Sequence, residues 1–140
     1  MLALRLVLDT NVVVSGALKP RGLERTALIF ALTPPAGLFV SQAILDEYIE
    51  VLSRAELHIP SDERQPLMDL ITRRGRLVVP GRKLEVCHDP DDNIFLECAE
   101  TARADYLITG NNKHFPRYWR STKIINAREL LEVIAPHLPL

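Results

Sequence analysis

The stretch Arg5-Leu6-Val7-Leu8-Asp9-Thr10-Asn11 decides the fold of this chain, because an apolar run ends there abruptly in a carboxylate. A continuous apolar run of this kind is typical of a strand buried on both faces of a parallel sheet. In open α/β sheets, ligands bind beyond the carboxyl ends of the strands, where Asp9 would stand. An Asp at that position can equally cap the following helix, so Asp9 alone leaves both roles open.

The size and composition of the chain predict a single domain over residues 1–140. Its 140 residues suffice for a buried core, and contents of 47% hydrophobic and 25% charged residues are ordinary for a globular protein. No apolar run is long enough to cross a membrane, and the N-terminus lacks a secretory pattern. Cys87 and Cys98 are too few for a disulfide framework or a zinc site. We therefore expect a cytoplasmic protein.

Apolar periodicity and turn residues divide the chain into alternating strands and helices. Strands are expected over residues 2–8, 38–40, 77–79, 106–109 and 123–125. Helices are expected over residues 12–18, 23–32, 42–53, 62–74, 92–103 and 127–135. Ser41, Ser61 and Asn126 are the expected helix caps, and Glu129 would complete a capping box with Asn126. The alternation predicts an α/β fold in three layers, with a small parallel sheet of four to five strands flanked by helices.

Two acids fall at unexpected places on the predicted helices. Glu47 borders the apolar stripe of its helix, whereas Asp46 and Glu50 point well away from it. Asp92 lies in the middle of an apolar face, at the first turn of its helix. The helix dipole favours an acid in the first turn but does not require a core-facing one. Burying a carboxylate is costly unless something compensates its charge, and a bound cation is the usual compensation.

A second strand ends in a polar turn, Thr109-Gly110-Asn111. Its carboxyl end should lie beside that of the first strand, so Thr109 is expected to hydrogen-bond to Asp9. Asp105 stands at the opposite end of the same strand, where a structural or supporting role is expected.

Asp9, Glu47 and Asp92, with Asn111 nearby, should therefore converge at one edge of the sheet. Hard oxygen ligands of this kind suit Mg²⁺ or Mn²⁺ rather than zinc. The chemistry that such a site serves best is phosphodiester hydrolysis, in which a metal activates water and neutralises developing charge. The rival EF-hand interpretation of residues 89–93 fails, because Ile94 occupies the position that requires Gly.

A basic segment follows the second polar turn. No acid occurs from Tyr106 to Arg128, whereas Lys113, Arg117, Arg120 and Lys123 lie within that stretch. Phe115, Tyr118 and Trp119 are interleaved with these cations, as suits contact with phosphates and unpaired bases. A solvated basic loop has the same composition, so both interpretations stay open.

Four motifs, in this order, resemble those of PIN domains. They are Leu8-Asp9-Thr10-Asn11-Val12, Leu45-Asp46-Glu47-Tyr48, Asp89-Pro90-Asp91-Asp92-Asn93, and Ala104-Asp105-Tyr106-Leu107-Ile108-Thr109-Gly110-Asn111. The resemblance covers about residues 5–131, and it is closest to bacterial PIN proteins that are VapC-like toxins of toxin–antitoxin systems. It implies a metal-dependent endoribonuclease.

The resemblance also implies roles for individual residues. The acidic quartet of the family falls on Asp9, Glu47, Asp92 and Asn111, and the last departs from the Asp of many relatives. Asp9 and Asp92 would coordinate Mg²⁺ or Mn²⁺, and Glu47 would hold a water for attack on the scissile phosphate. The residues expected to support the site are Thr109, Asn11, Asp105, Asp89 and Asp91. The residues expected to guide RNA are Lys113, Arg117, Arg120 and Lys123.

Two other functions stay open beside the ribonuclease. The missing fourth carboxylate would suit a catalytically weak PIN-like protein with a nucleic-acid-binding or regulatory role. A metal-dependent phosphohydrolase acting on small phosphate esters is the other alternative. The resemblance further implies a separate antitoxin protein and a homodimer, for which the apolar segments 12–18 and 23–32 could serve as interface or simply as core.

Overall fold

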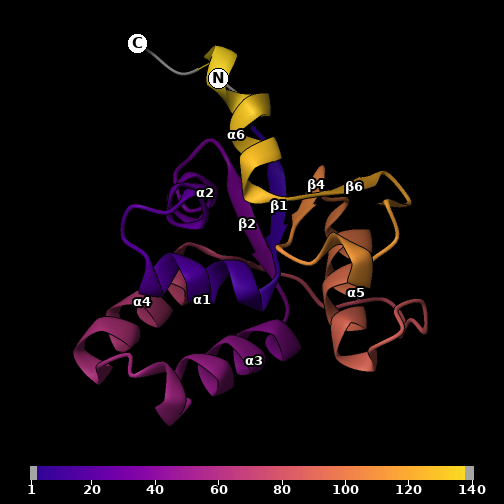
Figure 1. The fold of residues 1–140 in the computed structure, drawn as a ribbon. Helices are drawn as coiled ribbons and strands as arrows, with labels where there is room; N and C mark the ends of the chain where they lie inside the picture. Colours follow the sequence, from indigo (N-terminus) through magenta and orange to yellow (C-terminus); the bar gives the residue numbers. More distant parts are fainter. Residues whose placement is uncertain (1–2, 138–140) are drawn as a thin grey trace.

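The computed structural model describes residues 3–137, in which strands and helices alternate from the first strand onward (Figure 1). The strands are β1 (Arg5–Leu8), β2 (Gly37–Val40), β3 (Arg76–Leu77), β4 (Tyr106–Ile108), β5 (Tyr118–Trp119) and β6 (Thr122–Ile125). The α-helices are α1 (Thr10–Leu18), α2 (Leu23–Ala31), α3 (Gln42–Leu52), α4 (Ser61–Arg74), α5 (Asn93–Ala102) and α6 (Ala127–Ile134). Short 3₁₀ turns are η1 (Ala55–Leu57), η2 (Pro90–Asp92), η3 (Asn112–His114) and η4 (Ala135–His137).

The strands form one six-stranded sheet in the order β3-β2-β1-β4-β6-β5. Pairing is parallel from β3 to β6, with Leu6 opposite both Leu38 and Tyr106. The central strand β1 is flanked by β2 and β4, so its carboxyl end lies in the middle of the row of carboxyl strand ends. This is the edge at which the sequence predicts the site.

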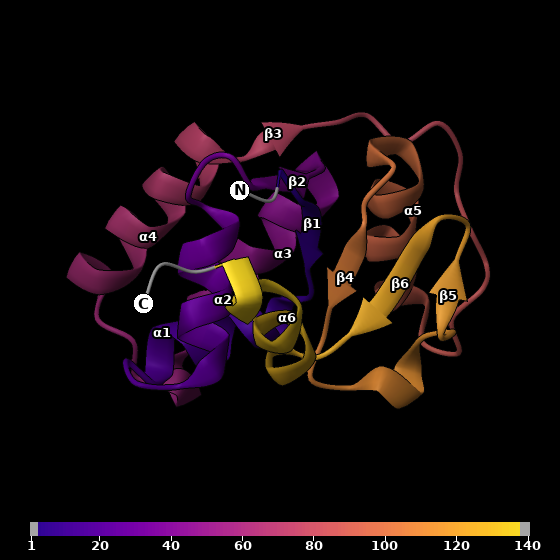
Figure 2. The same cartoon turned by 90° about the horizontal axis from the view of Figure 1, so that it is seen from above.

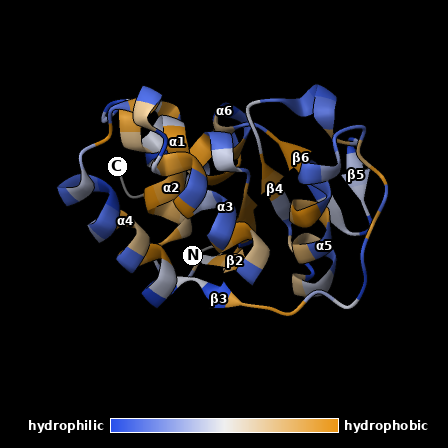
Figure 3. Ribbon diagram, turned by 90° about the horizontal axis from the view of Figure 1, so that it is seen from below, coloured by the Kyte–Doolittle hydropathy of each residue, from blue (hydrophilic) through white to orange (hydrophobic). Residues whose placement is uncertain are grey.

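The helices form layers on the two faces of this sheet. α5 packs against β1, β2 and β4, while α1 packs on α2 and α2 packs on α6 on the opposite side (Figure 2). Leu6, Val7 and Leu8 of β1 are fully buried between the layers, as their apolar run predicts. Hydrophilic residues instead colour much of α4 and the outer loops (Figure 3). The predicted three-layer α/β fold is therefore confirmed.

The predicted strands differ from the observed ones at the sheet edges. The sheet has a sixth strand, because the two residues of β5 pair antiparallel with β6 inside the segment that the sequence marks only as basic. The strand expected over 77–79 is wrong in its bounds. β3 covers only Arg76 and Leu77, and Val79 beyond it is 83% exposed. Residue 2 of the first predicted strand lies outside the described residues.

The helix caps were predicted correctly in two cases of three. The Ser41 hydroxyl accepts a hydrogen bond from the Ile44 backbone N–H, and Asn126 forms the predicted capping box with Glu129. The predicted cap at Ser61 is wrong, because α4 begins with Ser61 itself and Pro60 takes the cap position. The Pro60 carbonyl accepts hydrogen bonds from the backbone N–H groups of residues 63 and 64, which starts the helix one residue earlier.

Within residues 3–137, none of the helices has the length and apolar character needed to cross a lipid bilayer.

Candidate metal site

Asp9 lies at the carboxyl end of β1, where α1 begins. Although it occupies the cap position of α1, its side chain makes no capping hydrogen bond. Its Oδ2 instead accepts a 2.7 Å hydrogen bond from the Thr109 hydroxyl, which follows β4 on the neighbouring strand. Asp9 is only 7% exposed. The Asp9 carboxylate therefore does not cap α1, although the sequence leaves that role open.

Glu47 reaches the same region from α3. Its carboxylate accepts a hydrogen bond from the hydroxyl of Thr10, the residue after Asp9. The next residue, Tyr48, is fully buried and donates a 2.5 Å hydrogen bond to the Leu8 carbonyl. α3 is thus tied to the end of β1 on both sides of Asp9. Asp46 and Glu50 are exposed, as the helical spacing predicts.

Asp92 ends the η2 turn, immediately before α5. Its side chain is 15% exposed, and its Oδ2 is buried without any hydrogen-bond partner among the described residues. The Nδ1 atom of His114 lies 3.5 Å from this oxygen. A buried carboxylate oxygen without a hydrogen bond is costly, so it indicates a ligand of opposite charge.

These three carboxylates line one open cleft of about 400 Å³. The other predicted site residues in its lining are Asn111, Asn11, Asp89 and Asp91. Most of the predicted site residues therefore lie at one place in the fold, and their roles stay predictions.

The polar turn after β4 is held against the turn after β1. The Asn111 backbone N–H donates to the Thr109 hydroxyl at 3.0 Å, and the Asn11 side-chain oxygen accepts from the Gly110 N–H at 3.2 Å. Asp105 lies outside the cleft, at the opposite end of β4, where its carboxylate accepts a 2.8 Å hydrogen bond from the Arg5 N–H. Its contact is thus with the backbone of β1.

Burial disfavours the ionised form of Asp9, Glu47 and Asp92. It raises the pKa of Asp9 from 3.8 to about 6, to which the charges of Asp92 and Glu47 contribute, while the Thr109 hydrogen bond opposes the rise. Burial likewise raises the pKa values of Glu47 and Asp92. A cation bound between these groups would relieve both the desolvation and the mutual repulsion.

The donor set fits a hard divalent cation. Every candidate ligand is an oxygen, and one of them, Asp92 Oδ2, has no hydrogen-bond partner among the described residues. Within the described part of the chain, no three His, Cys, Asp or Glu side chains lie close enough to form a ready three-ligand cluster. Mg²⁺ is usually held by one or two carboxylates together with water, so a site of this kind suits it.

Sequence reasoning missed two basic residues of the cleft, His114 and Arg54. A signal for His114 is present: it follows Asn111 by three residues, and side chains three apart fall on one face of a 3₁₀ turn such as η3. Arg54 forms an exposed ion pair with Glu50 at 2.9 Å and has no comparable signal in the sequence.

The basic segment divides into residues with different contacts. Arg120 forms an ion pair with Glu100 at 3.2 Å, and its guanidinium lies 5.3 Å from the Trp119 ring centroid. Phe115 is buried in the core. Arg117 and Lys123 line a second cleft, outside the cleft of the carboxylates.

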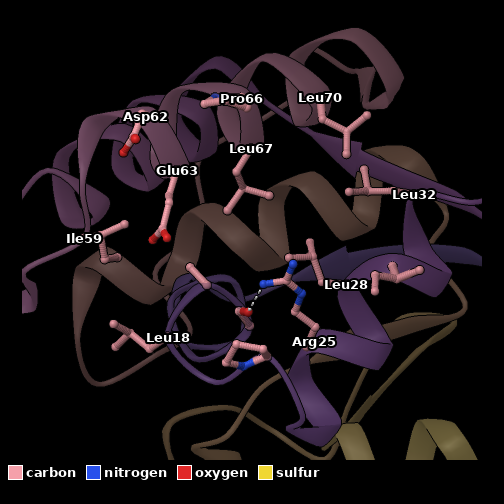
Figure 4. A pocket seen from close by; sticks show the side chains of 14 residues that line it. Leu18, Arg25, Leu28, Leu32, Ile59, Asp62, Glu63, Pro66, Leu67 and Leu70 are labelled. Carbon is pink, nitrogen blue, oxygen red and sulfur yellow. Dashed lines mark hydrogen bonds between the residues drawn. The ribbon is translucent and has the colours of Figure 1, made fainter.

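A larger cavity of about 690 Å³ lies between α1, α2 and α4 (Figure 4). It contains none of the predicted site residues, and leucines such as Leu28 and Leu67 form much of its lining. Val12 and Val13 of α1 and Ala27, Leu28 and Ala31 of α2 are buried in the core. Leu18 and Ile29 are 44% and 56% exposed beside this cavity.

Comparison with known proteins identifies the family. A family profile of the PIN domain matches residues 5–113, so the chain belongs to the PIN-domain family. The uncharacterized protein MJ1680 of Methanocaldococcus jannaschii is 27% identical over 113 residues, which cover 77% of this chain and 71% of that protein. The crystal structure of VapBC2 from Rickettsia felis, bound to a DNA fragment from their promoter, has a similar fold. The TM-score is 0.59 at 17% identity, over 87% of this chain and 98% of the other.

The predicted membership of the PIN-domain family is thereby confirmed. PIN domains are in general metal-dependent nucleases that use divalent ions. The fold likeness agrees with a mostly parallel sheet between helical layers.

Proposed function

We propose that this protein is an endoribonuclease that uses Mg²⁺ or Mn²⁺ to hydrolyse RNA phosphodiester bonds. The observation that carries the proposal is the buried Oδ2 of Asp92, which has no hydrogen-bond partner in the described part of the chain and lies in a cleft shared with Asp9 and Glu47. A bound cation would offset the burial and mutual repulsion that raise the pKa values of these three carboxylates. Membership of the PIN-domain family supports the same chemistry.

The chain's own residues divide the work of the site. Asp9 and Asp92 would hold the metal, which when bound supplies charge neutralisation and an activated water. Glu47, oriented by Thr10, would position the attacking water in line with the scissile phosphate. Thr109 fixes the orientation of the Asp9 carboxylate.

The remaining polar residues of the cleft would have supporting roles. Asn111 would offer a neutral oxygen where many relatives carry Asp, and Asn11 holds the turn before it through Gly110. Asp89 and Asp91 are exposed carboxylates in the same cleft, and they would add negative charge near the metal. We expect one firmly bound ion in the free protein, because Asn111 adds no charge for a second.

We further propose that the protein acts in the cytoplasm as the toxin of a toxin–antitoxin pair and forms a homodimer. The fold likeness to VapBC2 supports a separate antitoxin partner. Light scattering of the purified chain, alone and with a candidate antitoxin, tests the homodimer and the complex.

A catalytically weak PIN-like protein that binds nucleic acid is the second candidate. The observation that favours it is Asn111, which brings no fourth carboxylate to the cleft. Failure to bind Mn²⁺ at millimolar concentration would support this alternative over the nuclease.

The decisive experiment is cleavage of labelled RNA in Mg²⁺, Mn²⁺ or EDTA by the parent and by Asp9→Asn and Asp92→Asn. Asp105→Asn is the matched control, because Asp105 lies outside the cleft, at the end of β4 opposite to Thr109. Metal-dependent cleavage that is lost in the first two variants and retained in the control is expected. No cleavage by folded parent protein would refute the nuclease, and cleavage of small phosphate esters alone would identify a different phosphohydrolase.

A further inference from the structure

A second polar cleft, of about 280 Å³, borders the same short turn as the carboxylates. Asn111 and His114 line the carboxylate cleft, whereas Asn112 of the same turn lines the second cleft. A single 3₁₀ turn, η3, therefore separates the two clefts. β5 and β6, which follow η3 in the chain, lie at the sheet edge beyond β4 (Figure 2).

Two cations and one acid line the second cleft. Arg117 and Lys123 line it, and neither forms an ion pair within residues 3–137. Its acidic lining residue, Glu129, is engaged in the capping box, where its Oε1 accepts a 3.0 Å hydrogen bond from the Asn126 N–H. Arg120 of the same segment differs, because Glu100 already pairs with it.

Apolar and aromatic groups complete the lining of this cleft. Phe115, Pro116 and Ile124 form its apolar part. Beside it, the Tyr118 ring is 56% exposed, with Lys123 Nζ 5.9 Å from the ring centroid. Exposed aromatic rings next to cations are the usual platform on which unpaired bases stack.

The backbone that carries these side chains is hydrogen-bonded. The Ile124 N–H donates to the Arg117 carbonyl at 3.0 Å, and Tyr118 pairs with Lys123 across the β5–β6 ladder. Phe115 is buried in the core directly before this segment. The two cations are therefore presented by an ordered part of the sheet edge, which lowers the entropy cost of binding an anion.

We propose that this second cleft binds a backbone phosphate of single-stranded RNA, adjacent to the phosphate that is cleaved at the carboxylates. The inference rests on the proposed ribonuclease function and adds a substrate subsite to it. A strand crossing η3 would place one phosphate among Asp9, Glu47 and Asp92 and another at Arg117 and Lys123. An unpaired base could then stack on Tyr118.

The test is the double variant Arg117→Gln/Lys123→Gln. In an Asp92→Asn background, we expect the affinity for a labelled single-stranded RNA, measured by fluorescence anisotropy, to fall about tenfold at low salt. The slope of log affinity against log salt should become shallower by about 0.7, because the contact with one phosphate is lost. In the active protein, KM for a long strand should rise, whereas cleavage of a dinucleotide should not change.

The matched control is Arg21→Gln/Arg73→Gln, which removes the same charge from exposed positions on α4 and before α2. An equal loss of affinity in this control would overturn the subsite, because it would show a non-specific charge effect. Unchanged RNA affinity in the Arg117 and Lys123 variant would also overturn it, and so would a loss confined to duplex RNA. If the parent cleaves no RNA, the ribonuclease function is refuted. A loss of RNA affinity in the Arg117→Gln/Lys123→Gln variant would still show that the second cleft binds RNA.

Discussion

The hydroxyl of Thr109 donates a 2.7 Å hydrogen bond to Oδ2 of Asp9, joining the ends of two neighbouring strands whose residues are 100 positions apart in the chain. Both side chains are buried. The contact leaves the other lone pairs of the carboxylate for a ligand and fixes the direction in which they point. It also opposes the rise in the pKa of Asp9 that burial causes.

Thr109→Val should therefore weaken metal binding without changing the shape of the side chain. We expect a loss of about 10–100-fold in Mn²⁺ affinity, measured by titration calorimetry, as for other residues that orient metal ligands. Thr122→Val is the matched control, because Thr122 is equally buried and donates to the Ala104 carbonyl at 2.7 Å, away from the cleft. Equal metal affinities in the two variants would contradict the orienting role.

The stability of the metal-free protein should depend on pH through Asp9. Because its pKa is about 6 when folded and near 3.8 when unfolded, the folded state binds the proton more tightly. The free energy of unfolding should thus fall as pH rises from about 4 to about 6, and the Asp9 contribution to this fall is about 3 kcal/mol. Urea unfolding in EDTA across this range measures it. Asp9→Asn should flatten the curve and be the more stable protein at neutral pH, and parallel curves for the two proteins would disprove this.

Asn111→Asp should supply the fourth carboxylate that the resemblance to PIN domains implies at this position. We expect Mn²⁺ affinity to rise by roughly tenfold, because a charged oxygen is a better ligand for a hard cation than an amide. In EDTA the same variant should be less stable, since it adds a charge beside Asp92 and Asp9. Asn112→Asp serves as the control, because Asn112 lines the second cleft on the same turn. A gain in affinity for both variants would show a general charge effect.

Tyr48→Phe should loosen the attachment of α3 to the end of β1. It removes the hydrogen bond to the Leu8 carbonyl inside the core, at a cost of about 1 kcal/mol in the free energy of unfolding. Because Glu47 is the neighbouring residue, metal-dependent activity should fall as well. Urea denaturation measures the first effect, with Tyr118→Phe at an exposed position as the control. An unchanged midpoint for Tyr48→Phe would refute the structural role.

Much of the site could be predicted because it depends on where strands end. The apolar run before Asp9 identified a strand, and parallel pairing of β1 with β4 then brought Thr109 beside it. Helical spacing separated Glu47 from Asp46 and Glu50. Each of these arguments uses only a few neighbouring residues.

Other features required contacts between distant segments. His114 was missed although it lies 3.5 Å from Asp92, because η3 and η2 meet only in the folded chain. The sequence treats Arg117, Arg120 and Lys123 alike, but folding pairs Arg120 with Glu100 of α5. β5 has only two residues, too few for a hydrophobic periodicity. It is a strand only because it pairs with β6.

The sequence by itself thus determined the alternation of strands and helices, the caps at Ser41 and Asn126, and the candidate acids, because hydrophobic periodicity and capping act within a few residues. The tertiary structure alone decided which charges meet. Packing of segments far apart in the chain buries the Asp92 oxygen without a hydrogen-bond partner among the described residues. It also divides the basic segment, because Arg120 forms an ion pair while Arg117 and Lys123 line a cleft.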